Sequence, residues 1–316
     1  MRFVTFTTDS QPAPAWALDR SARIGVQLPD GRIHAMAAGR RLVDLIADGP
    51  EALAAHGQEA IDQPAAVLHT DNVRLLPPVP APPSVRDFMT FEQHIAGAVL
   101  TRGQDARVAP EWYDVPTFYF SNPAGLVGAR DPVPIAPGSD QLDLELEVAV
   151  VIGRAGTNIA VEDAAAHIAG YTILNDWSAR DLQRHEMRIG LGPAKGKDTA
   201  TTLGPALVTG DELANLDLGL RAYVNGQLLG QDLLSHMHWS FAQLVSYASR
   251  GTWLRPGDVL GSGTCGGGCL LELWGRQGFD ARPSLQVGDR VRLEVDVLGA
   301  VDNVIVGPDP VQRLTS

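Results

Sequence analysis

The chain has 316 residues, of which 45% are hydrophobic and 20% charged, proportions that are typical of a folded globular protein. Its formal net charge is −12 and its basic residues form no cluster, which argues against nucleic acid as a partner. Charged residues, Gly or Pro interrupt every long apolar run, so we expect neither a membrane-spanning helix nor a membrane partner. No apolar signal segment follows Met1, and we therefore expect a cytoplasmic protein.

Residues 1–76 are expected to form a small α+β unit, with strands over residues 2–8 and 22–28 and helices over residues 42–49 and 50–61. The segment PPVPAPP at residues 77–83 then holds five prolines, a composition typical of a stiff, extended connector. We therefore predict a small N-terminal domain over residues 1–80 and a second domain over residues 81–316.

The segment VRDFMTFEQHI, at residues 85–95, follows the connector. A helix over it would place Asp87 and His94 on the same side, because seven residues make about two helical turns. A lone histidine on such a helix is more often a packing or surface residue, and the nearby Asp87 raises the functional interpretation only modestly.

The segment LDLELEVAVVIG, at residues 142–153, alternates strictly between apolar and acidic residues at its start. On a strand, Asp143, Glu145 and Glu147 share one face. Three neighbouring carboxylates repel one another, and a hard divalent cation that takes oxygen ligands would neutralise them. A solvated outer face of an antiparallel sheet is the alternative interpretation.

The segment YTILNDWSARDLQ, at residues 171–183, predicts a buried strand that leads into a helix. Asp176 lies at the junction, where connections often carry functional residues. Arg180 and Gln183 are three residues apart, so both can point at one site from the helix. The loop that follows carries Lys195 and Lys197, and its order of Gly and Lys excludes a P-loop.

Strands dominate the remainder of the sequence. A helix is predicted to begin at Ser240, with Gln243 in the capping-box position, and LLELW is predicted to be a strand that carries Glu272. The two cysteines, Cys265 and Cys269, are interpreted as small residues of a tight loop, since their spacing does not match a zinc knuckle. No regular βαβ alternation occurs, so we expect an α+β, mostly β fold with antiparallel or mixed sheets.

Six motifs in this order resemble the fumarylacetoacetate hydrolase family over about residues 85–306: DFMTFEQH, LDLELEVAVVIG, YTILNDWSARDLQ, GKDTATTLGP, RGTWLRPGDVLGSGT and LLELW. The resemblance implies a C-terminal domain of the family's mixed β-roll or β-sandwich type behind the small N-terminal domain. It also implies a homodimer and a small oxo-acid or diketone substrate.

The resemblance assigns roles to individual residues. The expected metal ligands are Asp87, Glu145, Glu147 and Asp176, which as oxygen donors suit Mg²⁺ or Ca²⁺, with Mn²⁺ as a further candidate. His94, oriented by Glu272, is the expected proton-transfer group. The residues expected beside the reacting carbonyl are Lys197, Arg180 and Gln183, with Lys195 competing for the role of Lys197. The expected substrate contacts are Tyr119, Met89, Met187 and Thr264.

Met89 and Met187 occupy positions where the mammalian member of the family has tyrosines. Methionines there would make the pocket more apolar and more adaptable, which argues against fumarylacetoacetate itself as the substrate. Packing in the core is the alternative interpretation of both residues.

Three functions follow as hypotheses. The first is hydrolysis of a C–C bond in a 1,3-dicarbonyl compound by water that His94 activates. The second is decarboxylation or isomerisation of a related oxo-acid through a metal-stabilised enolate. The third is a catalytically silent metal-binding scaffold, because a fold alone does not prove activity.

Overall fold

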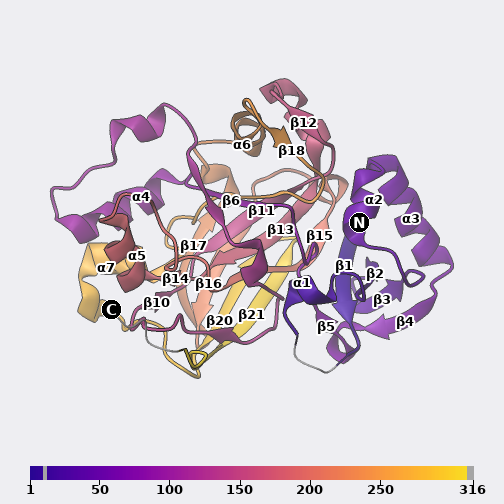
Figure 1. The fold of residues 1–316 in the computed structure, drawn as a ribbon, viewed down its shortest axis with the longest axis horizontal. Helices are drawn as coiled ribbons and strands as arrows, with labels where there is room; N and C mark the ends of the chain where they lie inside the picture. Colours follow the sequence, from indigo (N-terminus) through magenta and orange to yellow (C-terminus); the bar gives the residue numbers. More distant parts are fainter. Residues whose placement is uncertain (10–12, 312–316) are drawn as a thin grey trace.

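The computed structural model describes residues 1–9 and 13–311. Its main feature is a 12-stranded sheet that crosses the molecule, with the N-terminal unit at one end and helices α4, α5 and α7 towards the other (Figure 1). Along the sheet the strands are β4 (Ala66–His69), β3 (Arg32–Ala35), β2 (Arg23–Gln27), β1 (Arg2–Thr7), β15 (Thr201–Val208), β13 (Ile168–Asp176), β11 (Leu146–Ile152), β19 (Val259–Gly261), β6 (Val85–Phe88) and β7 (Phe118–Ser121), with β5 (Arg74–Leu75) beside β1 and β8 (Leu126–Val127) beside β15.

A second sheet of five strands packs against this one through the larger of two apolar cores. Its order is β17 (Gln227–Leu233), β16 (Gly219–Val224), β20 (Arg290–Val295), β21 (Gly299–Val306) and β9 (Val133–Pro134). Two further strand pairs are β10 (Leu142–Asp143) with β14 (Ser178–Ala179), and β12 (Gly156–Thr157) with β18 (Trp253–Leu254). The expected mostly β, α+β architecture is thereby confirmed.

The helices are short. The α-helices are α1 (Ala15–Leu18), α2 (Leu42–Ala47), α3 (Pro50–Asp62), α4 (Glu92–Val99), α5 (Arg180–Met187), α6 (Phe241–Ala248) and α7 (Leu270–Gln277). The 3₁₀-helices are η1 (Thr70–Asn72), η2 (Leu100–Arg102), η3 (Pro110–Tyr113), η4 (Pro123–Gly125), η5 (Val161–His167), η6 (Gly210–Glu212), η7 (Leu234–His236) and η8 (Phe279–Ala281). None of the helices within residues 1–9 and 13–311 has the length and apolar character needed to span a bilayer.

The N-terminal unit extends the main sheet. Strand β1 pairs antiparallel with β15, with Phe3 opposite Leu207, so one sheet continues across the expected domain boundary. Within the proline-rich segment, four successive residues are buried, from Pro77 to Pro80. The division at residue 80 therefore stays a prediction about domains, while the backbone pairing of the two parts is continuous.

Strand β11 explains why the acidic segment lies inside the protein. All seven of its residues are buried, because the larger core covers Val148 and Val150 on one face and a second core covers Ala149 and Val151 on the other. The backbone leaves regular pairing between β10 and β11, and Glu145 lies in that gap. The alternative of a solvated outer face is therefore wrong.

Two predicted elements near the site are also wrong. The helix expected over residues 85–95 is instead strand β6 followed by helix α4, so Asp87 and His94 belong to different elements. The strand expected at LLELW is helix α7, which carries Glu272. The capping box of Ser240 and Gln243 at the start of α6 is confirmed.

Candidate active site

Three carboxylates form the centre of the site. One oxygen from each of Asp87, Glu145 and Glu147 lies within 4.8 Å of the others. The three residues are 3%, 5% and 0% exposed, respectively. They come from β6, from the gap before β11 and from β11 itself. Carboxylates from distant parts of the chain therefore converge in the interior.

Strand β19, which lies between β6 and β11, leaves room for these carboxylates. Gly261, the last residue of β19, is paired with Asp87 on one side and with Ala149 on the other. A Cβ atom at Gly261 would lie 2.7 Å from Asp87 Oδ1 and 2.8 Å from Glu147 Oε2, closer than such atoms can approach. Gly261 thus leaves the space that these two carboxylate oxygens occupy, and a side chain there would displace them, a feature that the sequence analysis missed.

Asp176 and Tyr119 complete this cluster. Asp176 ends β13, and Tyr119 lies opposite Asp87 in the pairing of β6 with β7. The Tyr119 hydroxyl lies within hydrogen-bonding distance of Asp87 Oδ2, at 2.9 Å, and of Asp176 Oδ2. The structure thus brings together all four predicted metal ligands and one predicted substrate contact.

The donor set fits a hard divalent cation. Four buried carboxylate oxygens of the described residues have no hydrogen-bond partner, and three of them lie in this cluster: Asp87 Oδ1, Glu147 Oε1 and Asp176 Oδ1; the fourth is Asp198 Oδ1, outside it. Leaving such oxygens unpaired in the interior is costly, and a cation with oxygen ligands would satisfy them. Each of the three unpaired oxygens in the cluster belongs to a residue that was predicted as a ligand.

The pKa values of these carboxyl groups diverge. Burial raises the pKa of Asp176 to about 8, although Lys197 opposes the shift. Burial, reinforced by the neighbouring Asp87, raises the pKa of Glu147 well above its usual range. Burial acts in the same direction on Glu145, but Arg180 and Lys197 outweigh it and lower the pKa of that carboxyl. Without a cation, Glu145 is therefore the ionised member and the others tend to retain protons.

Two buried cations hold Glu145. Arg180 Nη2 donates to Glu145 Oε1 over 2.6 Å, and Lys197 Nζ donates to Glu145 Oε2 over 2.6 Å and also to Asp176. Lys195, by contrast, has a side chain 70% exposed and pairs with Asp198. The structure therefore places Lys197, rather than Lys195, at the carboxylates.

Asp143 has a separate task. Its carboxylate accepts hydrogen bonds from Arg180 Nε and Nη2, and from the backbone N–H groups of Leu270 and Leu271 at the start of α7. A carboxylate at a helix N-terminus satisfies N–H groups that have no partner within the helix. Asp143 thus fixes both Arg180 and α7, and Gln183 accepts a further hydrogen bond from Arg180 Nη1.

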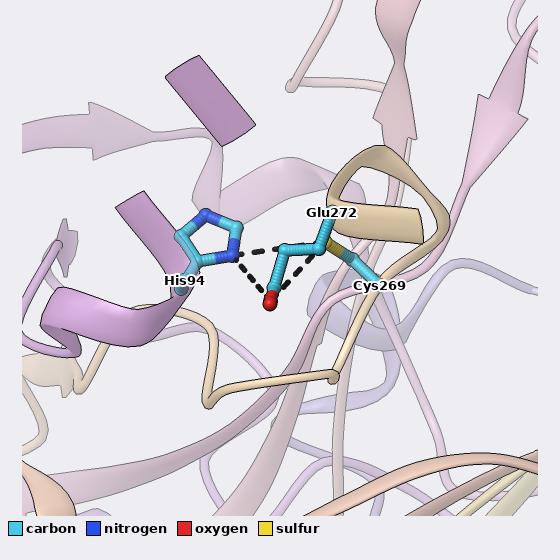
Figure 2. Close-up of side chains that lie close together, drawn as sticks. All are labelled: His94, Cys269 and Glu272. Atoms are coloured by element: carbon cyan, nitrogen blue, oxygen red, sulfur yellow. Dashed lines mark hydrogen bonds and ion pairs between the residues drawn. The ribbon is translucent and has the colours of Figure 1, made fainter. Parts of the chain in front are cut away.

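His94 and Glu272 form a buried pair (Figure 2). His94 Nδ1 and Glu272 Oε1 are 3.0 Å apart. The backbone N–H of Gly267 donates to both oxygens of Glu272, and Arg276 Nη2 donates to Oε2 over 3.1 Å. The predicted pairing occurs, although it joins helix α4 to helix α7 and not a helix to a strand.

Glycines allow these two helices to approach closely. A Cβ at Gly275 would lie 2.2 Å from the carbonyl oxygen of Gly97, and one at Gly97 would lie 3.0 Å from Glu272 Cγ. The close approach brings His94 and Glu272 into contact. Sequence reasoning missed both glycines, and it also missed Cys269, whose Sγ lies 3.7 Å from His94 Nδ1.

The remaining predicted substrate contacts differ in burial. Thr264 is buried in the loop after β19 and directly follows Gly263, whose N–H donates to Glu147 Oε2. Met89 and Met187 are 40% and 44% exposed, so the interpretation of both as core residues is wrong. No hydrogen bond or ion pair among the described residues joins the side chain of either methionine to the carboxylates, and their substrate contacts stay predictions.

Residues 85–306 match the family model described as "Fumarylacetoacetate (FAA) hydrolase C-terminal". The chain belongs to the fumarylacetoacetate hydrolase family. A mitochondrial oxaloacetate tautomerase of Xenopus laevis is 33% identical over 316 residues, which cover 97% of this chain and 90% of that protein. An oxaloacetate tautomerase of Bacillus subtilis is 30% identical over 273 residues, or 84% of this chain and 86% of that protein.

A solved structure shows the same fold. The fumarylacetoacetate hydrolase of Exiguobacterium antarcticum superposes with a TM-score of 0.74 at 28% identity, and the match covers 97% of this chain and 99% of that chain. The family therefore contains proteins named as hydrolases and proteins named as tautomerases, both similar to this chain along almost all of its length.

Proposed function

We propose that the protein is a divalent-cation-dependent enzyme that moves a proton at the enolisable carbon of a small 2-oxo acid bearing a second carbonyl group. The observation that carries this proposal is the buried contact of 3.0 Å between His94 and Glu272. Arg180 binds both Glu145 and Asp143, and Asp143 binds the backbone at the start of α7, the helix that carries Glu272. Tautomerisation of an oxaloacetate-like acid is the first candidate reaction, because similar proteins bear that name.

Asp87, Glu145, Glu147 and Asp176 would hold the cation. Mg²⁺ is the first candidate, with Mn²⁺ and Ca²⁺ as alternatives, since every donor is an oxygen. The cation would act as a Lewis acid that stabilises negative charge on the oxygens of a bound dicarbonyl compound.

His94 and Glu272 would transfer the proton. When Nδ1–H of His94 donates to Glu272, Nε2 is left free to accept a proton from carbon or from water. Glu272 fixes this tautomer and stabilises the imidazolium that forms. Its own position is fixed by Gly267 and Arg276, so the dyad is oriented before substrate binds.

Lys197 and Arg180 were both expected beside the reacting carbonyl, and we propose different roles for them. The Lys197 ammonium lies between Glu145 and Asp176, where it can also attract an anionic substrate oxygen. Arg180 donates hydrogen bonds to Asp143, Glu145 and Gln183. We therefore propose that it positions Glu145 and does not contact the reacting carbonyl directly.

Hydrolysis of a C–C bond is the second candidate. The same dyad could take a proton from water instead of from carbon, and the structural relative from Exiguobacterium antarcticum is named a hydrolase. Hydrolysis would add water across the bond next to a carbonyl, leaving one product as a carboxylate and the other as a protonated carbon acid. Decarboxylation of a β-oxo acid is the third candidate. It would release CO₂ without consuming water, and it would need the same stabilisation of negative charge on the carbonyl oxygen.

One pair of assays separates these reactions. The purified protein with Mg²⁺ is given oxaloacetate in D₂O and a panel of acylpyruvates and β-diketones in ¹⁸O water, with EDTA as the control. Accelerated loss of the enol with deuterium at the enolisable carbon supports tautomerisation, ¹⁸O in a carboxylate product supports hydrolysis, and CO₂ release supports decarboxylation. Absence of all three with cation bound would overturn the proposal and favour a silent scaffold.

We further propose a homodimer in the cytoplasm. Both are expectations of the family resemblance and of the sequence. Sedimentation at several protein concentrations tests the first, and cell fractionation with an antibody to the protein tests the second.

A further inference from the structure

A second group of possible metal ligands lies at the catalytic dyad. His94 Nδ1, Cys269 Sγ and Glu272 Oε1 all lie within 4.8 Å of one another, and all three residues are buried. Figure 2 shows the three side chains converging, with His94 coming from α4 and the other two from the start of α7 and the residue before it. The donors are one imidazole nitrogen, one sulfur and one carboxylate oxygen.

The spacing of these atoms suits a tetrahedral ion. Zinc bonds of about 2.0–2.3 Å to nitrogen, oxygen and sulfur, set at tetrahedral angles, place neighbouring donors about 3.3–3.6 Å apart. The observed separations are 3.0 Å from His94 to Glu272, 3.7 Å from His94 to Cys269 and 3.8 Å from Cys269 to Glu272. Shifts of a few tenths of an ångström would therefore suffice to hold the ion.

Glu272 is held in place by contacts from outside the cluster. Gly267 N–H donates to both oxygens of Glu272 and Arg276 donates to Oε2, and this orientation places Oε1 beside His94 and Cys269. Cys269 is the N-cap residue of α7, and its side chain makes no capping hydrogen bond. Its sulfur therefore does not bind the helix backbone and instead lies 3.8 Å from Glu272 Oε1.

The donor types separate this cluster from the carboxylate site. The carboxylates offer only oxygen and suit Mg²⁺, Mn²⁺ or Ca²⁺, whereas thiolate and imidazole ligands select zinc and similar softer ions. We propose that His94, Cys269 and Glu272 form a second, zinc-selective site, with water as the fourth ligand, and that zinc bound there inhibits the enzyme.

Inhibition follows from which atoms the ion would use. Zinc on His94 Nδ1 replaces the proton that this nitrogen donates to Glu272, and zinc on Glu272 Oε1 removes the acceptor. The imidazole can then no longer be stabilised as an imidazolium by Glu272. The zinc site itself is independent of the proposed function, whereas the inhibition rests on it.

Cobalt(II) tests the site, because Co²⁺ replaces Zn²⁺ and gives a thiolate-to-metal charge-transfer band that oxygen ligands cannot give. Co²⁺ is added to the intact protein in saturating Mg²⁺, and Zn²⁺ is then titrated to displace it. We expect the band in the wild type. We expect Cys269→Ser to abolish it and to weaken Zn²⁺ binding by at least about 100-fold, because loss of even an outer-shell partner costs about 10–100-fold.

Cys265→Ser is the matched control, since Cys265 is equally buried in the same loop and lies outside the cluster. Its band and zinc affinity should equal those of the wild type. Glu272→Gln provides a second variant, expected to bind Co²⁺ about tenfold more weakly, and it decides the matter if Cys269→Ser does not fold as judged by circular dichroism.

The outcomes are distinct. A wild type without the band, a band that persists in folded Cys269→Ser, a band lost equally in Cys265→Ser, or unchanged Co²⁺ affinity in Glu272→Gln would each overturn the proposed site. Turnover of the wild type in Mg²⁺ should fall over the Zn²⁺ range that displaces Co²⁺. If the protein has none of the proposed activities, the cobalt band still tests the site alone.

Discussion

Arg180 donates a hydrogen bond of 2.6 Å to Glu145, and the same guanidinium donates to Asp143 over 2.8 Å. One buried cation thus connects a predicted metal ligand to the residue that caps helix α7. The cation site and the helix that carries Glu272 are therefore positioned by a common group.

Replacing Arg180 should disturb both features. Arg180→Met would remove the guanidinium that pairs with Asp143 and Glu145, and breaking a buried ion pair costs about 3–5 kcal/mol. We expect a lower free energy of unfolding in urea and, by titration calorimetry, weaker Mg²⁺ binding. Arg188→Lys, at an exposed position just after the same helix, is the control and should change neither. Wild-type stability in Arg180→Met would contradict this account.

Gly261→Ala tests the space for the carboxylates. The added methyl group would lie under 3 Å from Asp87 and Glu147 and would force their oxygens apart. We expect Mg²⁺ affinity to fall at least about tenfold, since metal sites need ligands placed within about 0.2 Å. Gly307→Ala, where a Cβ meets nothing within 4 Å, should bind Mg²⁺ normally. Equal affinities in the two variants would show that Gly261 does not shape the site.

The effect of Mg²⁺ on stability should grow with pH. Burial raises the pKa of Asp176 to about 8, and burial also raises those of Asp87 and Glu147. A carboxyl group whose pKa is higher in the folded chain than in the unfolded chain stabilises the folded chain. This contribution is complete below the pKa of the unfolded chain, about 4, and is lost as the pH rises to the pKa of the folded chain. The cation-free protein should therefore lose stability from about pH 4 to about pH 8.

Mg²⁺ binds the ionised carboxylates and should restore that loss. Thermal unfolding with EDTA or with Mg²⁺ should thus give a larger Mg²⁺-induced rise in Tm at about pH 8 than at about pH 5. An equal or larger rise at the lower pH would mean that these carboxyl groups do not retain protons in the cation-free protein.

His94→Ala should remove turnover and spare the carboxylate site. Loss of a positioned acid–base group lowers kcat by about 10²–10⁴-fold. Mg²⁺ affinity should stay close to that of the wild type, because none of the proposed ligands is altered. His185→Ala, at an exposed position on α5, is the control for kcat. Normal kcat in folded His94→Ala would remove this residue from the mechanism.

The carboxylates of the site could be predicted from sequence because several acidic residues on one strand face indicate a bound cation whenever that face is buried. Three acidic residues alternating with leucines require neutralisation wherever they are buried, and that argument does not depend on the exact element. Glu145 and Glu147 accordingly lie in the cluster, while Asp143, which follows the same pattern, serves helix α7 and Arg180 instead. Pattern alone cannot distinguish a ligand from a helix cap.

The elements around the dyad were harder to predict. A short apolar run such as LLELW fits a strand or a helix equally well, and the capping carboxylate that favours the helix lies 127 positions away in Asp143. Strand β6 forms through parallel pairing with β19, a contact between segments far apart in the chain. The roles of Gly97, Gly261 and Gly275 likewise depend on which backbone passes nearby, which one sequence does not reveal.

The pairing of β1 with β15 bears on how the protein unfolds. Removing residues 1–80 would uncover part of the β15 edge, leaving backbone N–H and C=O groups unpaired beside Leu207, which is fully buried in the intact chain. β15 is also the direct neighbour of β13, which ends in Asp176. The N-terminal unit should therefore melt together with the catalytic sheet in a single cooperative transition, and a chain shortened to the family-matched region should aggregate instead of remaining an independent enzyme.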